Sequence, residues 1–187
     1  MNYISTFLET KVYDLPPEAW YVIGVIHGDG SLIEYDHKRS KRCKNGTRTY
    51  VQKEKRLTLQ TTSRVFAEHF ASMLRRLGFT VTLNGPYKRI NLGKESVYYN
   101  VQTYTNAYDY FVSYLHEVPT SDLDFYAFLS GFFDSDGCLI RDKRGAKTYI
   151  YLDFANSNKH FLEIIRNRLL DRGFHPTRIY ERKLSVK

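Results

Sequence analysis

The 187-residue sequence has few of the features that mark secreted, metal-cluster or membrane-spanning proteins. Its two cysteines, Cys43 and Cys138, stand far apart and fit no metal-ligand spacing, so we expect a reduced intracellular setting. No apolar run approaches the roughly 20 residues that cross a bilayer. The N-terminal residues lack the basic, apolar pattern of a signal sequence. We therefore expect a soluble, cytoplasmic protein without a membrane partner.

Acidic residues are also in short supply. Lys and Arg number 28 against 20 Asp and Glu, which gives a formal net charge of +8 and a pI near 9.4. This excess predicts an acidic partner. The basic residues cluster in predicted strands and turns rather than along an amphipathic helix, so nucleic acid fits better than a membrane surface. At 42% hydrophobic, the chain can bury one sizeable core, or two halves that share one.

The most informative feature that is present is a nine-residue segment that occurs twice. Residues 22–30 have the sequence VIGVIHGDG and residues 129–137 the sequence LSGFFDSDG. Each segment is an apolar run with small residues four positions apart, which lets two helices approach closely. The small residues are Gly24 and Gly28 in the first segment and Gly131 and Ser135 in the second. Two helices packed in this way would bring their C-terminal ends together.

Both segments end in an Asp-Gly pair. Gly30 and Gly137 stand where a left-handed helix cap is expected, which would place Asp29 and Asp136 in the last turns of their helices. The helix dipole is negative there and disfavours carboxylates. Two carboxylates at adjacent helix ends repel each other unless a cation lies between them, and Mg²⁺ prefers such oxygen ligands. One isolated Asp-Gly is more often a solvated helix end, but the matched pair predicts a divalent-metal site.

The duplication continues beyond these two helices. Asp29 and Asp136 are 107 positions apart, whereas residues 59–66 correspond to residues 154–161 at an offset of 95. The difference is the extra length of the first copy between its Asp-Gly pair and its second helix. A repeated module of this size predicts two domains, residues 1–118 and residues 119–187, which share the interface of the two motif helices.

These motifs and their matched downstream segments resemble a single-chain, two-repeat LAGLIDADG homing endonuclease of the archaeal intron-encoded type. The resemblance covers nearly the whole sequence. It implies an α+β fold, a pseudo-two-fold duplicated αββαββα arrangement with two antiparallel, saddle-shaped sheets. We expect the second repeat to be shortened at its C-terminus, either naturally or by truncation, because only residues 174–187 follow Gly173. His27 stands where the family consensus has its first acidic residue, and we interpret it as a packed histidine rather than a metal or proton ligand.

Turn and capping signals predict the individual elements. In the first repeat we expect a motif helix opened by Pro16, Pro17 and Glu18, a hairpin over 31–62 that turns at Asn45-Gly46, a helix over 64–77, a hairpin over 79–105 and a helix over 108–118. In the second repeat we expect a motif helix opened by Ser121 and Asp124, strands near 138–143 and 147–156, a helix over 158–171 and a final strand near 177–186. The helices are expected on one face of the sheets.

The face of the sheets without helices is expected to contact DNA, because a two-stranded antiparallel ribbon fits the major groove. Period-2 alternation identifies the side chains on that face. In the first hairpin they are Ser31, Ile33, Tyr35, His37, Tyr50, Gln52, Glu54, Arg56, Thr58 and Gln60. The second hairpin adds Tyr98, Asn100 and Gln102, and the second repeat adds Lys147, Tyr149, Tyr151 and Asp153. These polar rows are expected to discriminate between base pairs.

Basic residues crowd around the predicted turn of the first hairpin. Those predicted to bind DNA are Arg39, Arg42, Lys44 and Arg48, which would supply salt-sensitive, sequence-independent affinity for phosphate. Arg64 and Lys159, at the starts of the second helices, are predicted to bind phosphate as well. By resemblance, Ser63 and Asn158, which precede them, border the catalytic pocket.

The resemblance implies site-specific hydrolysis of both strands of a long double-stranded DNA target across the minor groove, leaving short 3′ overhangs. Asp29 and Asp136 would be the catalytic acids and, with the backbone carbonyls of Gly28 and Ser135, would hold Mg²⁺. Mn²⁺ is expected to substitute for Mg²⁺, and Ca²⁺ to bind without supporting cleavage. A monomer with internal pseudo-dimer symmetry is expected. Two alternatives stay open: a maturase that binds intron RNA, and a non-cleaving DNA-binding protein of the same fold.

Overall fold

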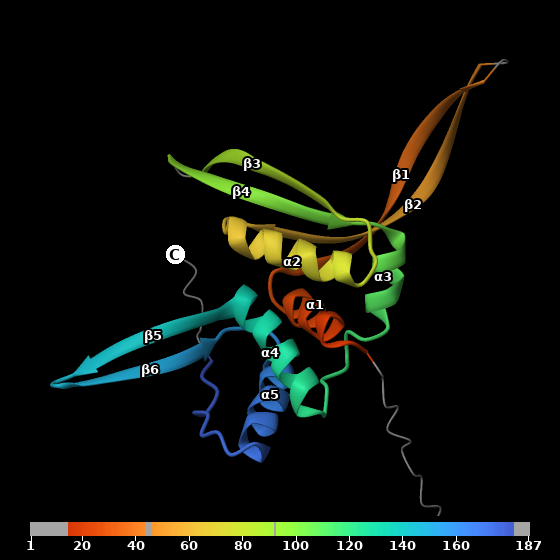
Figure 1. Cartoon of the computed structure of the whole chain (residues 1–187). Helices are drawn as coiled ribbons and strands as arrows, with labels where there is room; N and C mark the ends of the chain where they lie inside the picture. The colour runs from red at the N-terminus through yellow and green to blue at the C-terminus, as the bar shows by residue number, and fades with distance from the viewer. Residues whose placement is uncertain (1–14, 44–45, 92, 182–187) are drawn as a thin grey trace, which may run out of the picture.

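The computed structural model describes residues 15–43, 46–91 and 93–181. The first repeat contains α1 (Pro17–His27), β1 (Gly30–Cys43), β2 (Gly46–Thr61), α2 (Arg64–Arg76), β3 (Thr82–Asn91), β4 (Lys94–Thr103) and α3 (Thr105–Val112). The second contains α4 (Asp122–Asp136), β5 (Gly137–Arg144), β6 (Lys147–Phe154) and α5 (Lys159–Asp171). Figure 1 shows these elements in order. The arrangement confirms the predicted α+β class and is consistent with two repeats. Within the described ranges, no helix is both long enough and apolar enough to cross a membrane.

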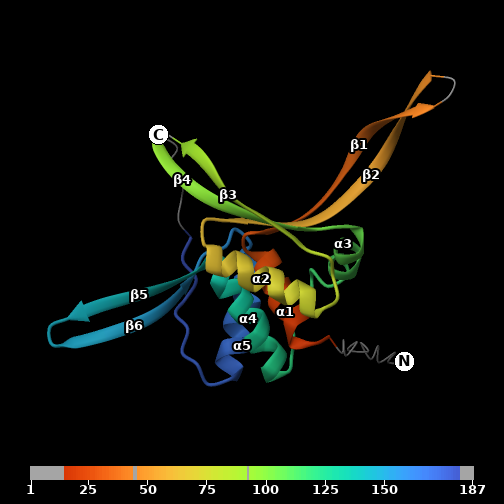
Figure 2. The same cartoon turned by 45° about the horizontal axis from the view of Figure 1, so that its top comes forward.

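Two antiparallel sheets carry the polar surfaces of the protein. The first repeat forms a four-stranded sheet in the order β1-β2-β4-β3, and the second forms a two-stranded sheet of β5 and β6. β4 pairs with β2 only between Leu57 and Thr61, so the outer part of the β1–β2 hairpin projects as an arm. Figure 2 shows that this arm and the β5–β6 hairpin extend in different directions from the helices.

Helix α1 lies at the centre of the structure. It starts after Pro16, with Pro17 and Glu18 in its first turn, as expected for a helix N-terminus. Every residue from Ala19 to Val25 is buried, which is typical of a helix covered on all sides. It packs against α4 and α2. The buried face of α2 presents Phe70 and Leu74 to the same core.

The predicted close packing of the motif helices is confirmed. A Cβ atom on Gly24 would lie 2.0 Å from the carbonyl oxygen of Phe128, and one on Gly131 would lie 2.0 Å from the carbonyl oxygen of Tyr21. Neither position leaves room for any side chain. The helices α1 and α4 therefore contact each other backbone to backbone, as the repeated small residues predict.

The predicted left-handed caps at Gly30 and Gly137 are wrong. Gly137 has extended backbone (φ −85°, ψ 153°), and both glycines are the first residues of strands. Strand pairing begins directly at the helix ends and takes the place of a local cap. α1 ends at His27, so Asp29 follows the helix instead of lying in its last turn, whereas Asp136 is the last residue of α4.

Two other predicted elements differ from the structure, and a third agrees with it. The closing helix of the first repeat begins at Thr105 and ends at Val112, earlier than the predicted 108–118. Residues 177–181 form no strand, and the rest of the predicted strand lies outside the described residues. The first hairpin does turn between Cys43 and Gly46, where Gly46 has φ +116°, but Lys44 and Asn45 are outside the described residues.

The two sheets differ in how well their helix-facing side chains are covered. Leu57 in β2 is fully buried, whereas its counterpart Leu152 in β6 is 59% exposed. Phe154, the counterpart of Leu59, is held by stacking on Phe132 with ring centroids 5.5 Å apart. Within the described residues, the second sheet has no strand at the position that β4 occupies beside β2. This difference leaves the outer part of the β5–β6 hairpin exposed on both faces.

Substitution of Gly131 tests the interface of the motif helices. Gly131→Ala is expected to lower the free energy of unfolding by about 1–3 kcal/mol, the usual cost of overpacking, because backbone atoms of α1 would have to move away. Urea unfolding measures the change. Ser130→Ala, on the exposed side of the same helix, is the control and should change stability by less than about 0.5 kcal/mol. Equal stability of the Gly131→Ala and wild-type proteins would contradict the close packing.

Candidate active site

The crossing of α1 and α4 places the two Asp-Gly segments side by side. A Cβ atom on Gly28 would lie 2.1 Å from Ser135 Oγ and 3.2 Å from Asp136 Cγ. Burial raises the pKa of Asp29 above its ordinary value, and the negative charge of Asp136 raises it further. The two predicted catalytic acids are therefore close enough to interact electrostatically, each contributed by one repeat.

Asn156 links the ends of the two motif helices. Its Nδ2 group donates to the carbonyl oxygen of His27 at 2.9 Å and to Asp136 Oδ2 at 3.1 Å. One amide thus orients the Asp136 carboxylate and fixes it to the end of α1. Sequence reasoning did not assign this role to Asn156. The available signal was its position, since the offset of 95 aligns it with Thr61 at the end of β2.

The segments that lead into α2 and α5 have the same hydrogen-bond pattern. The Ser63 amide donates to Thr61 Oγ1 at 3.1 Å, and the Asn158 amide donates to Asn156 Oδ1 at 2.8 Å. Ser63 Oγ and Asn158 Oδ1 then accept hydrogen bonds from the backbone of Phe66 and Phe161. Ser63 and Asn158 are thus N-caps. Each N-cap bond uses only an acceptor site of the side chain, so the Ser63 hydroxyl and the Asn158 amide group keep their own donors.

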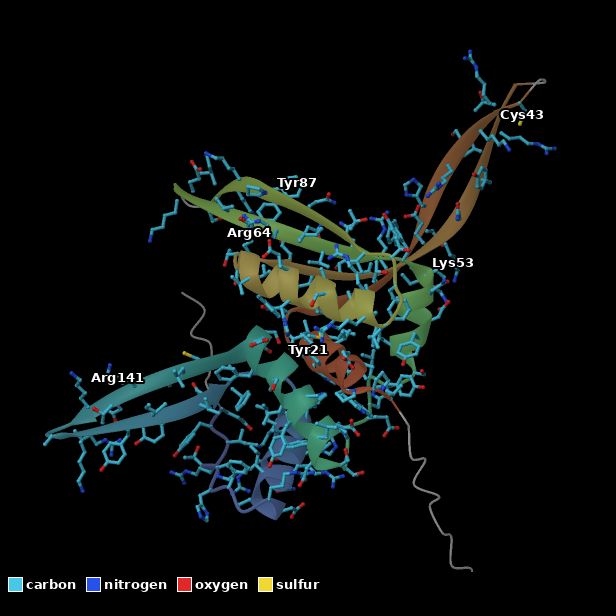
Figure 3. All side chains as sticks on the ribbon, viewed as in Figure 1. Tyr21, Cys43, Lys53, Arg64, Tyr87 and Arg141 are labelled. Atoms are coloured by element: carbon cyan, nitrogen blue, oxygen red, sulfur yellow. The ribbon has the colours of Figure 1, made fainter. Side chains whose placement is uncertain are left out.

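A cleft of about 500 Å³ lies between the start of α2 and the ends of the motif helices. Its lining includes Asp29, Thr61, Ser63, His69, Asp134 and Ser135. Asp134, the acid of the second motif that precedes Asp136, accepts a hydrogen bond of 2.7 Å from the Tyr21 hydroxyl. Tyr21 lies on α1 where that helix faces α4 (Figure 3). Burial and the Asp134 carboxylate both raise the pKa of Tyr21, so the phenol stays protonated and keeps donating. The cleft, Tyr21 and His69 were not identified from the sequence.

The position in the first repeat that corresponds to Asp134 has different surroundings. His27, the counterpart of Asp134, stacks on Phe161 with ring centroids 4.2 Å apart and contacts Phe128 edge to face. Phe128 is itself the counterpart of Tyr21. An acid with a phenol donor on one side is thus replaced by an imidazole among aromatic rings on the other. The structure agrees with the interpretation of His27 as a packed residue.

The register of the first sheet places the predicted DNA-facing side chains on one face. Ser31 is paired with Thr58, Tyr35 with Glu54, and Arg39 with Tyr50. The same face continues across β4, since Thr58 is paired with Gln102 and Gln60 with Asn100. The remaining members follow by alternation and are Ile33, His37, Gln52, Arg56 and Tyr98. The shared face is confirmed, and contact with DNA stays a prediction.

The predicted phosphate-binding residues are arranged less uniformly. Alternation places Arg48 on the face of Arg39, but Arg42 on the opposite face of the β1–β2 hairpin, and Lys44 is outside the described residues. Arg64 Nε pairs with Glu68 at 2.8 Å, and Lys159 Nζ pairs with Glu181 at 2.7 Å. Both pairs are exposed, so they contribute little and leave either cation able to exchange its carboxylate for phosphate.

The second sheet also has one polar face. Lys147, Tyr149, Tyr151 and Asp153 alternate along β6 and therefore lie on the same side. The rings of Tyr149 and Tyr151 are nearly parallel, with centroids 6.3 Å apart. The smaller sheet thus offers a cation and two aromatic rings in a row, as the sequence predicts.

Comparisons with known proteins agree with this geometry. The structure is similar to that of I-DmoI, a homing endonuclease, in a crystal structure with DNA and Mn. The TM-score is 0.55 at 20% sequence identity, and the match covers 84% of this chain and 78% of the I-DmoI chain. A structure of I-DmoI with DNA and Ca gives a TM-score of 0.54 at 20% identity, covering 84% and 72% of the two chains. The K262A mutant of I-SmaMI gives 0.50 at 12% identity, covering 86% and 74%. The chain has the LAGLIDADG fold.

Sequence comparisons give two further matches. Residues 126–186 match the family model of the LAGLIDADG-like domain, and the match runs from within α4 through β5, β6 and α5. The chain is also 25% identical over 163 residues to an uncharacterized protein, MJ0314, of Methanocaldococcus jannaschii. That match covers 83% of this chain and 55% of the relative, so the chain spans about half of the relative's length.

The buried histidine predicts a specific pH dependence of stability. Burial lowers the pKa of His27 from 6.5 to about 4, an effect only partly offset by a hydrogen bond with the Leu115 backbone. Because the folded protein favours the neutral ring, its stability is complete above pH 6.5 and falls as the pH decreases towards 4. His27→Phe keeps an aromatic ring in place but cannot titrate. Between pH 7 and pH 4 the wild type should lose roughly 3 kcal/mol of unfolding free energy relative to His27→Phe, measured in urea. Parallel pH profiles for the two proteins would refute the buried neutral state.

Proposed function

We propose that this protein is a site-specific DNA endonuclease that uses divalent metal to hydrolyse both strands of a duplex target across the minor groove, leaving short 3′ overhangs. The observation that carries this proposal is the meeting of Asp29 and Asp136 at the ends of two closely packed helices, from which the polar sheets extend. The fold supports it, since the structures it resembles include I-DmoI, a homing endonuclease, in complex with DNA. The two domains would be residues 1–118 and 119–187, acting as one monomer.

The residues at the helix ends fit a divalent cation. Asp29 and Asp136 are two hard oxygen donors. Burial, and then the charge of Asp136, raise the pKa of Asp29, and a cation would relieve the repulsion between the two carboxylates. Across the described ranges, no cluster of three or more His, Cys, Asp or Glu side chains is suited to holding a metal. The remaining ligands would thus be the backbone carbonyls of Gly28 and Ser135, water and the DNA phosphate. When bound, the metal would activate water and stabilise the leaving oxygen.

The protein groups around the acids have their own roles in this proposal. Asn156 holds the Asp136 carboxylate in one orientation through its 3.1 Å hydrogen bond. The cleft beside α2 gives water and a phosphodiester access to Asp29 from one side. His69 lines the same cleft, with its ring edge to face against Tyr21 at 4.9 Å between centroids, and would be the side chain that exchanges a proton with water there. The polar sheet faces would hold the duplex in register over these groups.

Removal of either acid should abolish cleavage. Asp29→Asn and Asp136→Asn are each expected to stop double-strand cutting, because each removes one of two metal-binding carboxylates, while DNA binding is largely retained. A plasmid library of randomised duplex sites, sequenced at the cut ends, identifies a target and measures the activity. Asp171→Asn, at the exposed end of α5, removes the same charge away from the site and should cut normally. Near wild-type cutting by either active-site variant would contradict the shared site.

Metal removal should separate binding from cleavage. With the selected target, binding is expected in Ca²⁺ or in excess EDTA, because phosphate contacts supply the affinity, whereas cutting should require Mg²⁺ or Mn²⁺. Gel-shift and cleavage assays on the same samples measure the two activities. Full cleavage in EDTA would disprove the mechanism. Binding without cleavage in every metal would favour the alternative of a non-cleaving DNA-binding protein.

A further inference from the structure

We propose that Glu54 is a positioning residue that fixes the guanidinium of Arg39 on the DNA-facing surface of the first hairpin, where Arg39 recognises a guanine. This inference rests on the proposed DNA-binding function and adds to it a specific residue, a base and a mechanism of selectivity. It gives Arg39 a role in base recognition in place of the phosphate binding that the sequence predicts for this residue.

Glu54 is at the centre of a compact network on that surface. Its carboxylate accepts hydrogen bonds from the Tyr35 hydroxyl at 2.8 Å, from Arg56 Nη2 at 2.6 Å and from Arg39 Nη2. His37 Nδ1 lies 3.6 Å away. By the strand register, all five residues lie on the face of the sheet that points away from the helices.

The burial of these groups separates their roles. The Glu54 side chain is only 10% exposed, whereas the Arg39 side chain is 47% exposed. Both carboxylate oxygens of Glu54 already have donors, so this group has little capacity to accept from a cytosine amino group. Arg39 has five N–H donors and uses one nitrogen on Glu54. His37, 45% exposed, is the other open group of the network, but only Arg39 has the paired N–H donors that match the two acceptors of a guanine edge.

Arg56 and Tyr35 serve to hold Glu54. The Arg56 guanidinium lies 5.4 Å from the centre of the Tyr35 ring and 6.0 Å from that of Tyr104, which restrains it against the sheet. Hydrogen bonds from Arg39, Tyr35 and Arg56 lower the pKa of Glu54 to about 2, so the carboxylate stays charged near neutral pH. Two guanidinium groups neutralise a carboxylate that would otherwise repel DNA phosphate.

A fixed guanidinium favours one base in particular. Guanine presents two acceptors, N7 and O6, in the major groove, and arginine binds them as a bidentate pair. Holding the side chain before binding reduces the entropy that is lost on contact and restricts the orientations in which it can bind. Glu54 would therefore increase selectivity through Arg39 without contacting the DNA.

The test is a double-mutant cycle read out by base preference. Wild type, Arg39→Ala, Glu54→Gln and the double variant are compared by competition binding, in Ca²⁺, against every single-base change of the selected target. Arg39→Ala is expected to lose roughly 5- to 150-fold of preference for guanine at one position, the value of one bidentate contact. Glu54→Gln should lose preference at that same position, and the double variant should lose no more than Arg39→Ala alone.

Two controls accompany the cycle. Glu34→Gln removes the same charge from the other face of the same hairpin, where Glu34 pairs with Lys53 at 3.0 Å, and should leave base preference unchanged. Tyr35→Phe removes one hydrogen bond to Glu54 but keeps all charges. Tyr35→Phe should cause a smaller loss of guanine preference at the same position. It also tests the role of Glu54 if the Glu54→Gln protein does not fold.

The alternative outcomes are distinct. Loss of preference by Glu54→Gln at a different position, additive with Arg39→Ala, would show that Glu54 contacts a base itself and would overturn the proposal. An equal loss of affinity for all sequences would make Glu54 a purely structural residue and would also overturn it. Absence of DNA binding by the wild type would refute the proposed function, which is a separate result.

Discussion

The structure depends on one close contact, the crossing of α1 and α4 without intervening side chains. Gly24 and Gly131 each face a backbone carbonyl at a distance that excludes a Cβ atom. Because the helices approach this closely, their C-terminal ends meet, and two carboxylates from distant parts of the chain interact. Asn156 can then bond to both helix ends with a single amide. The sheets begin directly after these ends, so the same contact also sets where the polar faces lie relative to the acids.

The two repeats differ in the side chains around the helix ends and in the size of their sheets. Beside one helix end, Tyr21 holds Asp134 at the edge of an open cleft, while at the equivalent position His27 is packed between Phe128 and Phe161. The sheets differ too, with four strands in one repeat and two in the other among the described residues. A duplex bound across both repeats would therefore meet chemically different surroundings in its two halves, although the two main acids are matched.

Features determined by local pattern could be predicted from the sequence. The small-residue spacing predicts the helix crossing, and strand alternation predicts which of the side chains from Ser31 to Gln60 share a face, because each pattern is visible within a single helix or strand. Features that depend on which particular partners the fold brings together could not be predicted from the sequence. Gly137 starts a strand because it pairs with Phe154, and the roles of Asn156 and Glu54 follow from partners that only the fold brings near. Residues 177–181 have a strand-like sequence but no neighbouring strand to pair with in the described structure.

The central claim is that Asp29 and Asp136 form one electrostatically coupled site. Carbon-detected NMR titration of the Asp29 carboxyl group, in the wild type and in Asp136→Asn, tests it most directly. We expect a raised pKa for Asp29 in the wild type, because of burial and of Asp136, and a lower pKa in the variant, where the neighbouring charge is gone. The same Asp29 titration curve in both proteins would show that the carboxylates do not interact, and would contradict the shared site.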